Sequence, residues 1–128
     1  MKRFLAVVTL VFILAAPSFA LTNREYGNLM SNPEFARADR RLNQVYADLR
    51  RTVSRAVWSV LKDEQKEWVD WGRDEDAQAY MDEYAYIRNE KQRWIKAYTM
   101  ATNDRANYLP RRARELAREM SRRRPGRR

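Results

Sequence analysis

Four carboxylates recur along one side of a predicted helix, and they are the residues best spaced to do chemistry together. They are Asp63, Glu67, Asp70 and Asp74, separated by four, three and four residues. A pair of carboxylates can cleave a glycosidic bond, but the reaction needs a cleft and one carboxyl group with a raised pKa. We expect this acidic face to lie opposite the packing side and to be wet. The pattern therefore argues against catalysis, and it predicts either a surface that binds a partner or a solvated helix face without one.

The composition of the 128-residue chain argues against most other reaction chemistry, because the sequence contains neither His nor Cys. The commonest general base, the thiol nucleophile and most zinc ligands are therefore missing. No twelve-residue loop with a glycine at its turn is present to bind calcium. We predict a protein that is not an enzyme and uses no metal and no cofactor. Without Cys we also expect neither disulfides nor a lipid anchor at a cleavage site, so the fold must depend on its core.

The acidic face belongs to residues 57–74, the stretch around which the sequence is organised. When these residues are wound at about 100° each, larger side chains gather on the other side: Trp58, Leu61, Gln65 and Trp68, together with Gly72. Ser54 can cap this helix through its hydroxyl oxygen. Each buried Trp contributes roughly 4–6 kcal/mol before entropy costs. Trp68 is therefore the side chain whose loss we expect to unfold the domain.

A second amphipathic helix of about twenty residues is predicted to begin at Pro33, after a cap formed by Ser31 or Asn32. Its apolar side chains recur every three or four residues: Phe35, Ala38, Leu42, Val45, Leu49 and Val53. Residues 21–32 have few apolar anchors, and we expect a flexible arm there. No segment alternates as a strand does. The predicted class is all-α, a small antiparallel helical hairpin or bundle of three to four helices over residues 33–109.

The later helix boundaries are predicted from local signals. We expect a kink or break near residues 72–76, where a glycine is followed by acidic residues. One unbroken helix over residues 55–100 is the alternative. A further cap is predicted at Thr102, and Pro110 disfavours helical geometry in the residue before it. Residues 110–128 are therefore expected to form a separate Arg-rich C-terminal helix and tail.

Charge and hydropathy are distributed unevenly along the chain. Lys2 and Arg3 precede an apolar run over residues 4–16, and small residues lead up to Ala20. This pattern is typical of a secretory signal peptide. We therefore predict cleavage after Ala20 and a periplasmic or secreted protein, with an uncleaved anchor as the alternative. Residues 21–110 hold fifteen basic and fifteen acidic side chains, so nearly all of the net charge of +9 lies in the C-terminal segment.

Residues 111–128 contain nine Arg and two Glu, which gives a net charge of +7. Basic segments bind anionic surfaces. We expect contact with anionic lipid headgroups or an acidic envelope polymer, and the alternative is a solvated tail without a partner. The arginines predicted to make this contact are Arg111, Arg112, Arg114, Arg118, Arg122, Arg123 and Arg124. Nucleic acid is not expected as a partner, because an exported protein rarely meets it.

Three blocks of the sequence carry a family resemblance. They are Ala38-Asp39 with Leu42, Asn43, Val45, Tyr46 and Leu49; then Leu61, Gln65, Trp68 and Val69; then Thr102, Arg105 and Leu109. Together they resemble the DUF1311 family, also called the lysozyme inhibitor LprI N-terminal domain family, whose members are small exported bacterial helical proteins. The chain departs from the family pattern in two ways. It lacks the family's cysteines and Gly-Gly-Ser loop, and it has Gly72 as an extra residue between Trp71 and Arg73.

The resemblance implies a fold and a function. The family-motif core is expected to comprise Leu42, Asn43, Val45, Tyr46, Leu49, Leu61, Gln65 and Trp68, with Asn43 and Gln65 bonded to backbone or to each other. The implied function is inhibition of lysozyme by protein–protein binding. The net charge of −7 over residues 63–83 suits a basic lysozyme. The alternative is an envelope interaction or chaperone-like module that exposes Tyr80, Tyr84 and Tyr86 and docks on anionic surfaces through its arginines.

Overall fold

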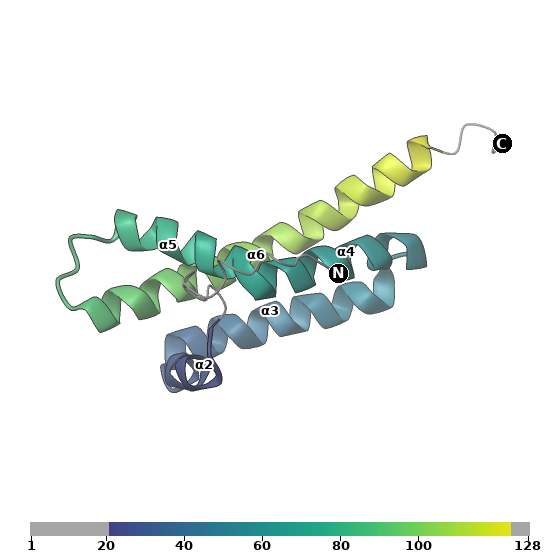
Figure 1. The fold of residues 1–128 in the computed structure, drawn as a ribbon. Helices are drawn as coiled ribbons and strands as arrows, with labels where there is room; N and C mark the ends of the chain where they lie inside the picture. Colours follow the sequence, from purple (N-terminus) through teal and green to yellow (C-terminus); the bar gives the residue numbers. More distant parts are fainter. Residues whose placement is uncertain (1–20, 124–128) are drawn as a thin grey trace, which may run out of the picture.

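The computed structural model describes residues 21–123 and shows an all-α fold in that part of the chain, which confirms the predicted class. The elements are α2 (Asn23–Met30), α3 (Pro33–Thr52), α4 (Arg55–Glu67), the π-helical turn η1 (Trp68–Gly72), α5 (Arg73–Glu83) and α6 (Glu90–Arg122). Figure 1 shows α6 running the length of the bundle, with the other helices arranged along it. The predicted signal peptide over residues 1–20 and the predicted contact residue Arg124 lie outside the described residues.

The prediction of a flexible arm over residues 21–32 is wrong, because most of this segment forms α2. The Thr22 hydroxyl accepts a hydrogen bond from the Glu25 N–H at 3.1 Å, and the Glu25 carboxylate accepts one from the Thr22 N–H at 2.9 Å. This reciprocal capping box satisfies two backbone donors at the start of the helix. Leu29 is fully buried and attaches α2 to the core. A cap and one anchor therefore order a segment that its composition alone describes as polar.

Two predicted helix starts are confirmed. The Asn32 side chain accepts hydrogen bonds from the N–H groups of Glu34 and Phe35 at 3.0 and 3.1 Å, and α3 then runs for 20 residues. The Ser54 hydroxyl accepts a hydrogen bond from the Val57 N–H at 3.2 Å and caps α4. In both places a short polar side chain precedes an amphipathic run, as helix N-termini prefer.

The chain stays helical from Arg55 to Glu83, so of the kink or break predicted near residues 72–76 the break is wrong. Within η1 the Arg73 N–H donates to the Trp68 carbonyl, five residues back. A π-helical turn of this kind accommodates one extra residue without interrupting the helix. The alternative of one helix over residues 55–100 is also wrong, because the chain leaves helical structure between α5 and α6.

Two more boundary predictions fail within α6. Thr102 does not cap a helix, because it is buried in the middle of α6. Pro110 also lies inside this 33-residue helix. Proline in a helix interior costs about 3 kcal/mol, but Leu109 and Ala113 on either side are both buried in the core. Packing therefore outweighs the local cost, and the predicted separate Arg-rich helix is the last part of α6.

Two clusters of buried side chains share α6 as their packing partner. One cluster joins α3, α4 and η1 to the C-terminal half of α6: Leu42, Val57, Leu61, Trp68, Ala106, Leu109, Ala113 and Leu116. The other joins α2, α3 and α5 to its N-terminal half: Leu29, Phe35, Ala77, Ala97, Tyr98 and Ala101. α3 and α4 follow each other in the chain, but they do not pack closely against each other as the predicted hairpin requires, and the principal partner of α3 is α6. The longest helix therefore holds the bundle together.

Gly72 tests the packing of the π-helical turn, because a Cβ added there would lie 2.9 Å from Cδ1 of Trp68. We predict that Gly72→Ala lowers the free energy of unfolding by about 1–2 kcal/mol, since the buried indole must move to make room. Gly27→Ala in α2 is the matched control, because no neighbouring side chain lies within 4 Å of its added Cβ. This control should stabilise the protein by up to about 1 kcal/mol. Urea unfolding measures both, and equal effects would contradict the prediction.

Candidate functional site

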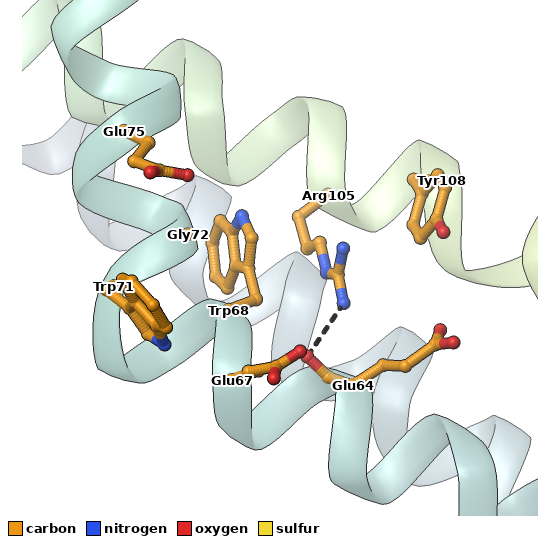
Figure 2. A pocket seen from close by; sticks show the side chains of 8 residues that line it. All are labelled: Glu64, Glu67, Trp68, Trp71, Gly72, Glu75, Arg105 and Tyr108. Atoms are coloured by element: carbon orange, nitrogen blue, oxygen red, sulfur yellow. Dashed lines mark hydrogen bonds between the residues drawn. The ribbon is translucent and has the colours of Figure 1, made fainter. Parts of the chain in front are cut away.

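A surface groove of about 470 Å³ lies where η1 faces α6. Aromatic and acidic side chains predominate in its lining, which consists of Glu64, Glu67, Trp68, Trp71, Gly72, Glu75, Arg105 and Tyr108. Figure 2 shows Arg105 and Tyr108 on α6, across the groove from the residues of α4, η1 and α5. Three carboxylates face one guanidinium group, so the lining carries a net negative charge.

Trp68 forms the buried wall of the groove, with only 5% of its surface exposed. Its indole N–H donates to Oδ2 of Asp76 at 2.9 Å. The guanidinium carbons of Arg73 and Arg105 lie 5.6 and 5.3 Å from the ring centre. A cation near an aromatic ring is attracted to its electron-rich face. These contacts fix the position of the indole at the base of the groove.

Arg105 closes the groove on the α6 side and joins α6 to α4. Its Nε donates to Oε1 of Gln65 at 2.9 Å, and Nη2 donates to the Glu64 backbone carbonyl at 3.3 Å. The guanidinium carbon lies 4.7 Å from the centre of the Tyr108 ring. Burial lowers the pKa of Arg105 from its ordinary value, although a guanidinium stays charged in proteins. Arg105 is therefore a structural cation, because two of its three nitrogens are bonded to α4.

Glu64 is neutralised by Arg112, which lies about two turns beyond Arg105 on α6. Arg112 Nε donates to Oε1 at 3.0 Å and Nη2 donates to Oε2 at 2.7 Å, a bidentate pair that is only partly exposed. These hydrogen bonds hold the pKa of Glu64 below its ordinary value of 4.5, and they raise the pKa of Arg112. The carboxylates of the groove that remain free to meet a partner are those of Glu67 and Glu75.

The solvent side of the groove presents an indole between two acidic side chains. Trp71 is 52% exposed, and Glu67 and Glu75 are exposed on neighbouring turns of the same helix. Trp side chains are frequent anchors of protein–protein interfaces, and unpaired carboxylates favour a positively charged partner. The arrangement therefore suits binding of a basic protein surface.

The four predicted carboxylates do not share one face. Asp63, Glu67 and Asp70 are exposed, and Asp70 pairs with Lys66 at 3.0 Å. Asp74 instead accepts a hydrogen bond from the Tyr98 hydroxyl, and burial raises its pKa. The cause is η1, because its extra residue rotates the following side chains by about 100° relative to a uniform α-helix.

The sequence does not point to five of the groove residues as functional: Glu64, Trp71, Glu75, Arg105 and Tyr108. Arg105 lies in a block that resembles the family, but its spacing reveals nothing about its position across from Trp68. The only available signal is the extra Gly72, because an added residue in a helical pattern can mark a π-helical turn.

Most of the predicted family-motif core is confirmed in place. Leu42, Leu61, Gln65 and Trp68 are buried, and Val45, Tyr46 and Leu49 are partly buried against them. Asn43 is exposed and donates to Asp39 at 3.3 Å, so it does not belong to the core. The predicted bonding of Asn43 and Gln65 to backbone or to each other is wrong, because Gln65 bonds to Arg105.

The predicted arginine contacts separate into two groups. Arg111, Arg114, Arg118, Arg122 and Arg123 are exposed. Arg112 is held by Glu64 and is therefore not free for an anionic surface.

Residues 21–123 offer neither a metal site nor a membrane-spanning helix. Within this range no three acidic side chains gather closely enough to hold a metal ion. None of the helices described there has the length and apolar content needed to cross a membrane.

The Glu64–Arg112 pair predicts a pH dependence of stability. Because the folded protein lowers the pKa of Glu64 from 4.5, the pair stabilises the fold above about that pH and loses its effect as the pH falls through the lower folded pKa. Glu64→Gln should therefore destabilise the protein at pH 7 and cost progressively less below pH 4.5. Urea unfolding at several pH values measures the difference. Glu67→Gln, in the same groove, is the control, and a pH-independent effect of Glu64→Gln would contradict the prediction.

Comparison with known proteins identifies the family. No curated protein and no solved structure matches the chain. The sequence model of one family, described as Lysozyme inhibitor LprI, matches residues 22–120. This range contains both buried clusters and every residue that lines the groove. The chain belongs to the lysozyme inhibitor LprI family.

Proposed function

We propose that this protein is an exported inhibitor that binds a basic lysozyme through the groove beside η1. Membership of the lysozyme inhibitor LprI family supports this function. The observation that carries the proposal is the half-exposed indole of Trp71 between Glu67 and Glu75. Neither carboxylate has a hydrogen-bond or ion-pair partner within the part of the chain that the structure describes.

The charge around the groove favours association with such a partner. Residues 63–83 contain nine acidic side chains against Lys66 and Arg73, which gives a net charge of −7. Many lysozymes are basic, and complementary charge steers the diffusional encounter of two proteins. Salt screens this attraction over about 8–10 Å at physiological ionic strength. Trp71 is the apolar anchor of the proposed interface, and the carboxylates of Glu67 and Glu75 beside it orient the basic partner.

Export places the inhibitor where lysozyme acts. The basic start of the chain, the apolar run over residues 4–16 and the small residues that end at Ala20 support a cleaved signal peptide. Inhibition by binding needs no catalytic group, which agrees with a sequence that has no His and no Cys.

The alternative of a chaperone-like module has less support. It requires an exposed aromatic surface formed by Tyr80, Tyr84 and Tyr86. Tyr84 is buried, and the Tyr80 hydroxyl donates to Asp104. Tyr86 is 72% exposed, but it contacts the Tyr84 ring edge-on rather than extending a patch. One exposed ring does not form a surface that holds unfolded chains.

The role of Trp71 can be tested by inhibition of a basic lysozyme. We predict that the chain from Leu21 inhibits lysis of cell walls and that Trp71→Ala raises the inhibition constant by about 30-fold, the effect of losing an anchor worth about 2 kcal/mol. Tyr86→Ala removes another exposed ring outside the groove and should leave inhibition unchanged. Thermal melting of both variants checks that the fold is retained.

The contribution of charge can be tested in the same assay. Glu67→Lys with Glu75→Lys should weaken inhibition at least tenfold more than Asp82→Lys with Glu83→Lys, because both pairs change the net charge equally but only the first lines the groove. Equal effects would place the contact elsewhere. No inhibition by the unaltered chain at a large molar excess, at low and at moderate salt, would refute the proposed function.

A further inference from the structure

The last part of α6 carries a row of arginines on its solvent side. Arg111, Arg114, Arg118 and Arg122, the arginine row, are all exposed and are separated by three, four and four residues. At 100° per residue they fall within about 80° of one another, along about 17 Å of the helix. Ala113 and Leu116 lie on the opposite side and are buried. The fold therefore presents the row outward in a fixed orientation.

The charges of the arginine row are not used inside the protein. Within residues 21–123, Arg114, Arg118 and Arg122 have no hydrogen-bond or ion-pair partner, whereas Arg112 is bound to Glu64. Arg111 lies 5.5 Å from the centre of the Tyr108 ring and keeps its exposed guanidinium. The row thus offers several free cations to a partner outside the chain.

An apolar groove of about 360 Å³ lies beside the arginine row, between α6 and the turn that joins α3 to α4. It is lined by Leu49, Thr52, Val53, Ser54, Val57, Pro110, Ala113, Arg114 and Ala117. The same turn is flanked by the exposed side chains of Arg50 and Arg55, and by Arg51, which is paired with Asp48. This end of the bundle therefore combines an apolar slot with a cationic rim.

We propose that this end of the protein docks on a membrane surface that contains anionic phospholipid. The phosphate headgroups lie against the arginine row, and the upper part of one acyl chain enters the apolar groove. An anionic polymer or a nucleic acid satisfies only the cationic rim. A phospholipid has an anionic head joined to an apolar chain, so it is the partner that matches both features.

The docking is peripheral rather than inserted. Ala113 and Leu116 belong to the core, so α6 cannot turn an apolar side into the bilayer while the bundle stays folded. Attraction between basic side chains and anionic headgroups supplies most of the binding, about fivefold per Arg near the surface. Binding is consequently weakened by salt.

Co-sedimentation with lipid vesicles tests the proposal. The chain from Leu21 contains both buried clusters and leaves out the apolar run over residues 4–16. It should bind vesicles of phosphatidylglycerol and phosphatidylcholine, less tightly as salt is added, and should not bind phosphatidylcholine alone. The triple variant R114Q/R118Q/R122Q should lower the partition coefficient on the order of 100-fold. The matched control R24Q/R37Q/R40Q removes the same charge from exposed positions of α2 and α3 and should lower it far less.

Three results would overturn the proposal. They are equal losses in the two triple variants, equal binding to phosphatidylcholine alone, and binding to soluble dextran sulfate without binding to anionic vesicles. Ala117→Gln narrows the groove at an exposed position without changing charge. It should weaken vesicle binding several-fold, and unchanged binding would exclude an acyl chain from the groove. R114Q/R118Q/R122Q should still inhibit lysozyme. The vesicle assay and the inhibition assay therefore test the two proposals independently.

Discussion

The fold and the candidate site both depend on the burial of Trp68 in the π-helical turn. Burying an indole is worth roughly 4–6 kcal/mol, a large share of the 5–15 kcal/mol that typically stabilises a native protein. Trp68 belongs to the cluster that joins α3 and α4 to α6. The Arg73 guanidinium beside it also lies 5.9 Å from the ring centre of Tyr26 in α2. Because the chain contains no Cys, no disulfide can replace these contacts.

The same turn produces the groove. The extra residue of η1 directs Arg73 and Asp74 inward and leaves Trp71 half exposed beside Glu75. Position 72 favours a glycine, because an added Cβ would lie 2.9 Å from Cδ1 of Trp68 and the indole would have to shift. The extra Gly72, which departs from the family pattern, is thus explained by the close approach of the Trp68 indole. Single π-helical turns are frequent at functional sites, and here the turn places a buried indole, Trp68, next to an exposed one, Trp71.

Local sequence signals correctly predicted the features that depend only on neighbouring residues, namely helix caps and the apolar side of a helix. The Asn32 and Ser54 caps and the apolar spacing of α3 act within one or two turns, and all are confirmed. Predictions failed where distant packing decides, as at Pro110, which the core holds inside α6. The prediction of one acidic face was only partly right. It assumed a uniform α-helix, and the π-helical turn places Asp74 away from the exposed Asp63, Glu67 and Asp70. Arg105 binds a side chain 40 residues away. The periodicity of one helix does not predict which distant helix packs against it.

Acidic side chains around the groove and arginines on the last part of α6 give the domain two surfaces of opposite charge.

The most direct test of the central claim, that the partner binds beside η1, is an NMR titration of the ¹⁵N-labelled chain with a basic lysozyme. Three of its four Trp residues report on separate places, with Trp71 on the groove rim and Trp58 and Trp94 against the two buried clusters. The Trp71 indole signal should shift or broaden while those of Trp58 and Trp94 stay unchanged. Changes at Trp58 or Trp94 without one at Trp71, or no change at all, would contradict the claim.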